Sequence, residues 1–511
     1  MNALPASILM NYLFAAVALS ILGLTKHRKV LDIIALSASV TGLMLSLILM
    51  RYITSNGSIT YTFGGFKPPL GVVYYADFVS GVFSLISSFA LLISTMCAFA
   101  TMSFATRKYL YILAYLLLTG VHGFIFSGDV FHLYVSVELI AISAYAITAL
   151  YSNRSGNIRA ALLYGIAGTS ITSFLFLAVI ILYGSYGTVN MADIALKSIF
   201  NEEYVPYSGY VFGDVSTASI VALALITWVF LFKSGIMPNH FWLPNVYRVT
   251  PIAGLILFTS SADLIGIYGV LRLYHVVFGD RCIISSFRTT MMSLLTAMSM
   301  ISIFFSSLLV AKQVRIRNIV AYSTIAQLSI ALSGVVAGVP EAVSGAILHV
   351  VASALGDALV LCGFTLHAWS SNKHMRKLGM VSISIGFVNL FGLLPIVPGF
   401  WSKALMSLGF LKVGNLLGVI VILLSTGLCA IGYFRYLTRI AIRELAKSTP
   451  PRDYSEKMLS IPVVILITVT IGFSLSIILN PYLLPIVINN TLDSTRSDRF
   501  IYNLLGIKPG E

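Results

Sequence analysis

Long apolar runs follow one another along almost the whole chain, with only short polar stretches between them. A helix that crosses the hydrocarbon core of a bilayer needs about 20 mainly apolar residues. Only 10% of the 511 residues are charged and 58% are hydrophobic, so the chain cannot cover a soluble fold of this size with a polar surface. These features exclude a soluble enzyme, a nucleic-acid-binding protein and a disordered protein.

The apolar runs predict an all-α polytopic membrane protein. They are continuous, whereas the strands of a membrane barrel alternate in polarity over about 10 residues. The shortest connections, at 311–318 and 338–342, are the least distinct boundaries. We predict fourteen spans, at residues 6–24, 30–50, 77–105, 109–127, 130–151, 158–184, 217–246, 251–275, 289–311, 318–338, 342–370, 379–411, 415–437 and 460–486.

The basic residues predict how the chain lies in the membrane. Most Lys and Arg fall in the loops after odd-numbered spans, for example at Lys312, Arg315 and Arg317 and along residues 435–457. Basic loops stay on the cytoplasmic side, so both termini are expected outside the cell membrane. The net charge of +14 is therefore interpreted as membrane topology and not as a nucleic-acid signal. The first apolar run lacks a basic n-region and is read as a retained span.

Five ionisable residues fall well inside predicted spans: Glu138, Lys233, Asp263, Asp357 and Lys403. A charge at mid-bilayer costs at least ~2.5–3.5 kcal/mol on insertion scales. Each side chain is therefore expected to face a protein interior or a hydrated cavity, where it would serve ion translocation. The alternative is a set of buried ion pairs that only fix helix packing.

Two of these lysines lie beside predicted helix breaks. Pro238 lacks the N–H that would continue the helix after Lys233, and Pro395 and Pro398 interrupt the twelfth span before Lys403. Broken backbone at membrane depth survives only where protein or water covers it. Broken helices at corresponding places in two halves of a chain indicate a transporter core. Proline kinks for packing and chance similarity of short strings remain as alternatives.

The eleventh span carries His349, Ser353 and Asp357 at a spacing that places them on one helix face. Histidine exchanges protons near neutral pH, so this face could pass a proton along the bundle. A buried, hydrogen-bonded histidine without transport is an equal alternative. Asp263 could pair with Lys233 from the preceding span.

Several strings along residues 75–440 resemble one known family. The chain is similar to the antiporter-like subunits of respiratory complex I, and equally to the D subunit of Mrp cation/proton antiporters and its counterparts in membrane-bound hydrogenases and related archaeal complexes. The strings that carry the resemblance are residues 129–139, 233–244, 266–269, 321–327 and 398–403.

The resemblance implies fourteen helices with two inverted five-helix repeats and broken helices 7 and 12. It divides the chain into helices 1–3 (1–105), a first repeat of helices 4–8 (106–278), a second repeat of helices 9–13 (279–440), and a loop, helix 14 and tail (441–511). It also implies a Glu–Lys pair at Glu138 and Lys233, a second lysine at Lys403 and a relay histidine at His349.

The chain departs from the family pattern at three positions. The family usually has lysine where this chain has Leu264, and histidine and lysine where it has Ser353 and Asp357. The connecting lysines of the axial relay are thus absent or replaced by a carboxylate. Carboxylates can carry protons or can favour Na⁺, which prefers oxygen ligands.

We therefore predict a subunit that translocates protons or Na⁺ within a multisubunit membrane complex, either a redox-driven pump or an Mrp-type antiporter. The chain carries no cofactor-binding motif, so no cofactor is expected and any redox chemistry would belong to partner subunits. The expected partners are other membrane subunits and the lipid bilayer, with no nucleic acid. Two alternatives are a scaffold subunit without its own complete ion path and an antiporter that works alone.

Overall fold

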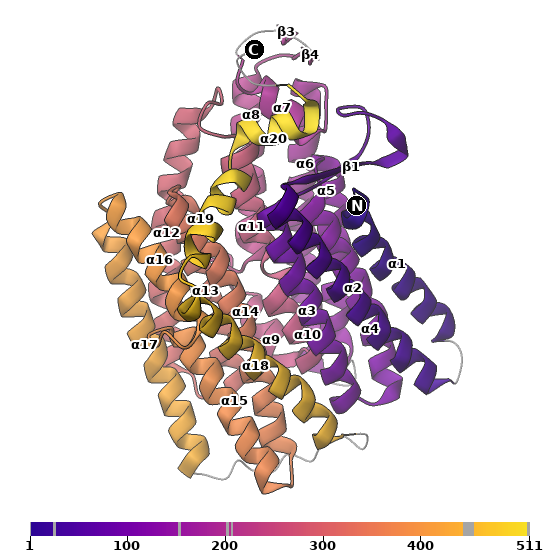
Figure 1. Ribbon diagram of the computed structural model, residues 1–511, viewed down its shortest axis with the longest axis vertical. Coiled ribbons are helices and arrows are strands. Elements are labelled where there is room, and N and C mark those ends of the chain that lie inside the picture. The colour runs from indigo at the N-terminus through magenta and orange to yellow at the C-terminus, as the bar shows by residue number, and fades with distance from the viewer. Residues whose placement is uncertain are drawn as a thin grey trace.

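The computed structural model describes residues 2–23, 27–151, 155–200, 204–205, 208–442 and 454–507, without the side chain of residue 155. Within these ranges the chain forms a bundle of long helices (Figure 1). Thirteen described helices are long and apolar enough to cross a membrane, and the broken pair α15 and α16 supplies a further crossing. The chain is a multi-pass membrane protein with the expected all-α fold.

The first six crossings are unbroken, the seventh is divided and the eighth contains two π-helical turns. The helices of this half are α1 (Leu4–Leu22), α2 (Arg28–Asn56), α3 (Phe78–Thr101), α4 (Phe104–Phe126), α5 (Val130–Ala149), α6 (Ser155–Tyr186), α8 (Val215–Lys233), α9 (Leu243–Val249), α10 (Ile252–Leu257), η2 (Phe258–Ala262), α11 (Ile265–Leu271) and η3 (Arg272–Val277).

The second half repeats the pattern of long helices with one divided crossing. It comprises α12 (Ser285–Lys312), α13 (Ile316–Val336), α14 (Pro340–Trp369), α15 (Lys373–Phe391), α16 (Pro398–Lys412), α17 (Leu416–Ile442) and α18 (Glu456–Leu479). The very short turns expected near residues 311–318 and 338–342 are present between α12, α13 and α14. Residues 443–453, which include much of the predicted basic loop, lie outside the described residues.

Short elements cover one end of the bundle. They are the strands β1 (Ile59–Thr62), β2 (Val73–Ala76), β3 (Tyr204–Val205) and β4 (Gly209–Tyr210), the 3-10 turn η1 (Phe63–Gly65), and the helices α7 (Met191–Lys197), α19 (Leu483–Ser494) and α20 (Ser497–Leu505). The two antiparallel hairpins, β1–β2 and β3–β4, are strands that the apolar pattern did not predict because they lie in polar loops. The predicted spans themselves contain no strand among the described residues.

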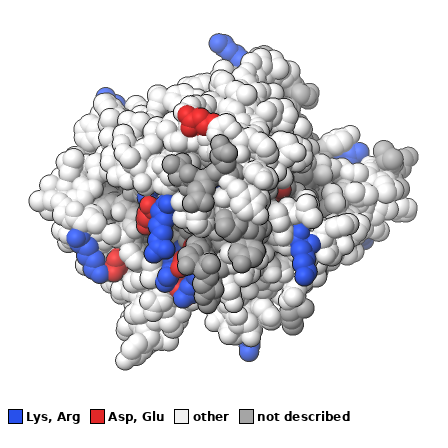
Figure 2. All heavy atoms as spheres, turned by 90° about the horizontal axis from the view of Figure 1, so that it is seen from above, with Lys and Arg blue, Asp and Glu red and all other residues white. Residues whose placement is uncertain are grey.

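A buried ion pair ties this end of the bundle together. Asp77 begins α3 as its N-cap, and both of its carboxylate oxygens accept from Arg272, at 2.6 and 2.7 Å. Arg272 also donates to the hydroxyl of Tyr268 and the carbonyl of Ser494. Seen from above, some basic and acidic side chains of this face lie next to one another, while other basic side chains stand alone (Figure 2).

The central helices are buried on all sides and the peripheral helices are not. The segment from α10 to η3 is wholly buried, as is nearly all of α13 and α14, whereas α2, α6 and α18 bury about a third of their residues or less. Helices that are apolar all round belong in the centre of such a bundle. This arrangement places Lys233, Asp263, His349, Asp357 and Lys403 inside protein and not against lipid.

Candidate functional site

The first helix break follows Lys233 directly. Helix α8 ends at Lys233, Gly235 adopts a left-handed backbone with φ +61°, and helical structure resumes at Leu243. A side chain at Gly235 would also collide with Leu243, 2.6 Å from the position of an added Cβ. The indole of Trp242 reaches back across the break and donates to the carbonyl of Phe232 at 3.1 Å. The break predicted in the seventh span is present.

Lys233 is 3% exposed, and its ammonium nitrogen has no hydrogen-bond partner among the described residues. The expected pair with Glu138 is not a contact ion pair, because the described residues contain no salt bridge between these side chains within 4.0 Å. Glu138 on α5 is half-buried, and it and Asp263 are both near enough to attract the ammonium electrostatically. Two carboxylates therefore attract the lysine, and neither forms a salt bridge with it within the described part of the chain.

Asp263 directly follows a π-helical turn. The five residues Phe258–Ala262 form this turn, and the amide of Asp263 donates to the carbonyl of Phe258, five residues earlier. Single π-turns inside helices occur frequently at functional sites. The carboxylate of Asp263 accepts from the hydroxyl of Tyr247 on α9 at 2.5 Å. The expected partner Lys233 attracts Asp263 but does not form a salt bridge with it.

Tyr247 and Thr324 extend the row from Asp263 toward Asp357. Thr324 of α13 lies near the hydroxyl of Tyr247, without a hydrogen bond to it within 3.5 Å, and donates to one carboxylate oxygen of Asp357 at 3.0 Å. The other oxygen of Asp357 is buried and has no partner within the described part of the chain. Asp263, Tyr247, Thr324 and Asp357 thus form a row of side chains across four segments. We call it the central row.

Sequence reasoning did not identify Tyr247 or Thr324. Thr324 lies inside one of the strings that carry the family resemblance, residues 321–327, but it was not singled out because a threonine in a helix usually bonds to its own backbone. Tyr247 lies three residues beyond another such string. A buried tyrosine needs a partner for its hydroxyl, and that requirement is the signal that could have found Tyr247.

The second helix break holds its lysine differently. Helix α15 ends at Phe391, Gly392 adopts φ +66°, and α16 starts at Pro398. The ammonium of Lys403 reaches back to the end of α15 and donates to the carbonyls of Leu390 and Phe391, each at 2.9 Å. It also donates to the hydroxyl of Thr426 on α17 at 3.2 Å. The break predicted in the twelfth span is present, and Lys403 caps its first half.

The predicted polar face of α14 is divided between two neighbouring helices. His349 contacts Ser402 of α16 through Nδ1 at 3.0 Å, whereas Asp357 contacts Thr324 of α13. Ser353 bonds to the carbonyl of Val350 in its own helix. Nε2 of His349 is buried without a partner among the described residues. The three residues therefore do not form one hydrogen-bonded chain.

The site consists of the central row, with Lys233 at one end, and of a second group formed by His349, Ser402 and Lys403. Lys233, His349 and Asp357 each present a buried polar atom without a described partner. Buried polar atoms in native proteins are normally satisfied by protein or by ordered water. These positions are where water or a cation would complete the hydrogen bonding of the site.

Comparison with known proteins supports one family. The family described as NADH:quinone oxidoreductase/Mrp antiporter, TM, matches residues 127–429. The D subunit of a Na(+)/H(+) antiporter from Bacillus subtilis (strain 168) is 28% identical over 364 residues, which are 71% of this chain and 70% of that protein.

Solved structures share the fold over almost the entire chain. A chain of the membrane-bound sulfane sulfur reductase, an archaeal respiratory membrane complex, superimposes with a TM-score of 0.85 at 24% identity, covering 98% of this chain and 99% of that one. A chain of the Mrp complex from Dietzia sp. DQ12-45-1b gives a TM-score of 0.82 at 18% identity, covering 99% of each chain. Because the family match includes both helix breaks and the central row, the chain belongs to the NADH:quinone oxidoreductase/Mrp antiporter transmembrane family.

Proposed function

We propose that this chain moves protons or small cations across the cell membrane as one subunit of a multisubunit complex. The observation that carries the proposal is the buried central row, in which Asp263 at the first break accepts from Tyr247 and Asp357 in the second half accepts from the neighbouring Thr324. Ionisable side chains inside a membrane are costly and mark ion pathways. Two buried carboxylates in one interior row, with the buried Lys233 as a third ionisable group, exceed what packing requires.

The proposed path begins at Lys233, near Glu138. The ammonium makes no hydrogen bond to a described residue, so it can release or accept a proton without first breaking one. Ionised Glu138 and Asp263 both attract it, so movement of charge at either carboxylate changes the energy of the protonated lysine. Tyr247 and Thr324 then offer hydroxyl groups that donate and accept hydrogen bonds between Asp263 and Asp357.

His349 and Lys403 would continue the path in the second half. The chain from Asp357 to His349 runs eight residues along α14, roughly 12 Å at the rise of an α-helix, so water must bridge this interval. We infer that residues 106–278 and 279–440 act as two related units, each with one broken helix and one lysine. Both termini are proposed to face outward.

The relatives provide two candidates for what drives this movement. One similar structure belongs to the membrane-bound sulfane sulfur reductase, a respiratory complex, and another belongs to an Mrp complex. The first would couple ion movement to redox chemistry in partner subunits, and the second would couple it to the exchange of another cation. The carboxylates of the central row suit either a proton or Na⁺, because oxygen ligands bind hard cations.

The central row can be tested with Tyr247→Phe and Thr324→Val in everted membrane vesicles that contain the whole complex. Dye quenching would report proton movement when Na⁺, K⁺ or a respiratory donor is added. We expect each variant to reduce the initial rate severalfold, because each removes one hydroxyl from the row. Tyr186→Phe is the matched control, since Tyr186 bonds to Ser219 at 2.7 Å in the buried interior but outside the row.

Assembly must be measured in the same membranes by native gel electrophoresis. Normal assembly with unchanged ion movement in the Tyr247→Phe and Thr324→Val variants would contradict the proposal and favour a scaffold subunit. If the purified chain moves ions in liposomes without partners, the subunit assignment is wrong and the chain is an antiporter that works alone.

A further inference from the structure

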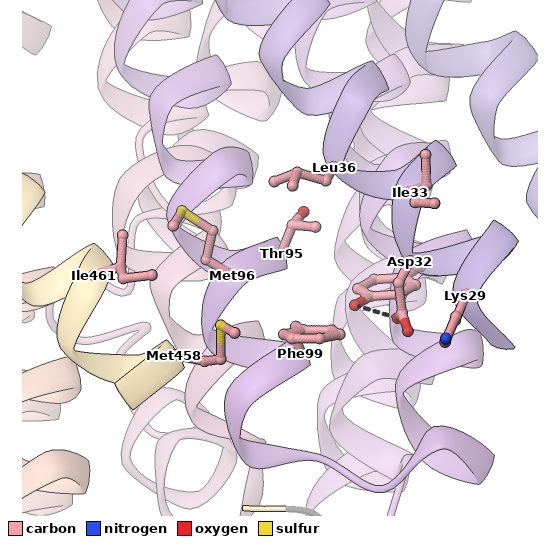
Figure 3. A pocket seen from close by; sticks show the side chains of 10 residues that line it. Lys29, Asp32, Ile33, Leu36, Thr95, Met96, Phe99, Met458 and Ile461 are labelled. Atoms are coloured by element: carbon pink, nitrogen blue, oxygen red, sulfur yellow. Dashed lines mark hydrogen bonds between the residues drawn. The ribbon is translucent and has the colours of Figure 1, made fainter. Parts of the chain in front are cut away.

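A cavity of about 360 Å³ opens among the outer helices, and no residue of the central row lines it (Figure 3). Its walls come from segments that are distant in sequence: the start of α2, the end of α3 and the start of α18. Figure 3 shows Lys29, Ile33 and Leu36 of α2 on one side, Met458 and Ile461 of α18 on the other, and Met96 and Phe99 of α3 between them. The cavity is thus a cleft between α2 and α18 with α3 as its floor.

The walls of the cleft face the lipid region of the membrane. Ile33 is 65% exposed, and Leu36, Met458 and Ile461 are each more than 40% exposed. These side chains lie on helices that the bundle buries only on their inner sides. In a bilayer, an apolar cleft at such a surface fills with an apolar group, because water gains no hydrogen bonds there.

One end of the cleft is polar and carries positive charge. Asp32 lies at this end, but it is neutralised by Arg107, whose guanidinium reaches the carboxylate at 2.6 and 2.9 Å. The hydroxyl of Tyr111 also donates to Asp32 at 3.1 Å, as the dashed line in Figure 3 marks. Lys29 is exposed and has no hydrogen bond or ion pair with another described residue. The ammonium of Lys29 therefore remains available for an anion.

We propose that this cleft binds one anionic phospholipid, with an acyl chain between α2 and α18 and the headgroup phosphate at Lys29. Basic positions between membrane helices on the cytoplasmic side recognise anionic headgroups. Lys29 lies in the first turn of α2, at the end of the bundle that is predicted to be cytoplasmic. The lipid lies between α2 and α18, which form opposite walls of the cleft and both pack against α3.

The size of the cleft favours a lipid chain over a protein helix. The lining residues of α2 extend from Lys29 to Leu36, about 10 Å along the helix axis. An α-helix with its side chains is about 10 Å wide, and this whole width would have to fit between α2 and α18. A flexible acyl chain is narrower and fits the space without displacing α18.

The test uses the full-length chain, purified in detergent and depleted of lipid. Phosphatidylglycerol or phosphatidylcholine with identical acyl chains is added, and bound lipid is counted by native mass spectrometry at increasing detergent. We expect one phosphatidylglycerol to remain bound after phosphatidylcholine has been lost. Lys29→Gln should reduce this preference roughly fivefold, the effect of one interfacial charge.

Lys312→Gln is the matched control, because Lys312 is an exposed lysine at the same end of the bundle but does not line the cleft. It should leave the preference unchanged. Leu36→Trp fills the cleft from an exposed position and should prevent retention of either lipid. Equal retention of the two lipids by the unmodified chain, or an equal loss of preference in Lys29→Gln and Lys312→Gln, would overturn the proposal. A photo-crosslinker at residue 36 that captures a neighbouring subunit and no lipid in the native complex would overturn it as well.

Discussion

The two broken helices each carry a buried lysine, but they hold it in opposite ways. Lys403 donates to two carbonyls at the end of α15 and to Thr426, whereas Lys233 has no hydrogen-bond partner among the described residues. Both are almost fully buried, at 7% and 3% exposed. Burial alone therefore does not determine whether a lysine is fixed.

The two lysines lie on opposite sides of their breaks, since Lys233 ends α8 whereas Lys403 lies in α16, and different side chains reach the carbonyls before each break. In the first break the indole of Trp242 donates to the carbonyl of Phe232, so that group is not available to Lys233. In the second break the corresponding Trp401 donates to Pro395 in the connecting loop, and the end of α15 is left to Lys403. Lys403 is thus held at the negative end of α15, whereas Lys233, although it is the last residue of α8, has no hydrogen-bond partner among the described residues.

The largest expected effect is on ion movement through Lys233. Lys233→Gln should reduce the rate in vesicles by at least tenfold, because it removes the buried cation that both Glu138 and Asp263 attract. Lys403→Gln should reduce it less if the ammonium of Lys403 serves mainly to cap α15. Initial rates of dye quenching, normalised to assembled complex, provide the measurement. A smaller loss for Lys233→Gln than for Lys403→Gln would reverse this ranking of the two lysines.

The thermal stability of the protein should depend more on Lys403 than on Lys233. Lys403→Met leaves the carbonyls of Leu390 and Phe391 without their donor, and a buried acceptor that loses its partner costs about 1–3 kcal/mol. Lys233→Met removes a buried charge that has no hydrogen bond, so the variant should be as stable as the parent or more stable. Thermal unfolding of the two purified variants in one detergent compares them directly. Equal destabilisation would show that Lys233 has a partner in solution.

The sequence predicted the arrangement of the chain better than the contacts within it. The apolar runs located the crossings, and Pro238, Pro395 and Pro398 located the breaks, because both features follow from local chemistry. Helical spacing correctly placed His349 and Asp357 along one helix. It could not show that one turns toward α16 and the other toward α13, since this depends on how the neighbouring helices pack.

The central row could not be predicted for a similar reason. The π-helical turn before Asp263 directs its carboxylate to Tyr247, and no local sequence signal announces such a turn. The expected Glu138–Lys233 contact came from the family resemblance, and the described structure separates the two side chains. Long-range contacts between polar side chains thus decide the site, whereas hydrophobic pattern decides the fold.

The two tryptophans offer a smaller and more specific test of the same comparison. Trp242→Phe removes a fully buried donor and should lower stability by about 1 kcal/mol, the net value of one hydrogen bond. Trp401→Phe removes a donor at a half-exposed position, where water can replace it, so its effect should be smaller. Thermal unfolding of both variants gives the ranking. A larger effect at Trp401 would contradict the view that Trp242 closes the first break.

The smallest effect concerns the helices that lead into the breaks. Helix α8 begins at Asp214, whose pKa lies below its ordinary value because the hydroxyl and the amide of Thr217 donate to the carboxylate. A lowered pKa in the folded state means that the cap stabilises α8 above the ordinary carboxylate range and is lost as pH falls through the lowered pKa. Helix α15 begins at Asn372, which caps through its amide oxygen and does not titrate.

Hydrogen exchange in the first turns of α8 and α15 can separate the two cases. Between neutral pH and about pH 3, after correction for intrinsic exchange rates, the first turn of α8 should lose protection while that of α15 keeps it. Asp214→Asn retains a capping oxygen and removes the titration, so α8 should then behave like α15. Because the capped turn of α8 lies at the far end of the helix from Lys233, the change should stay local. If protection is lost along α8 as far as Lys233, the effect of the cap is not local and this expectation is wrong.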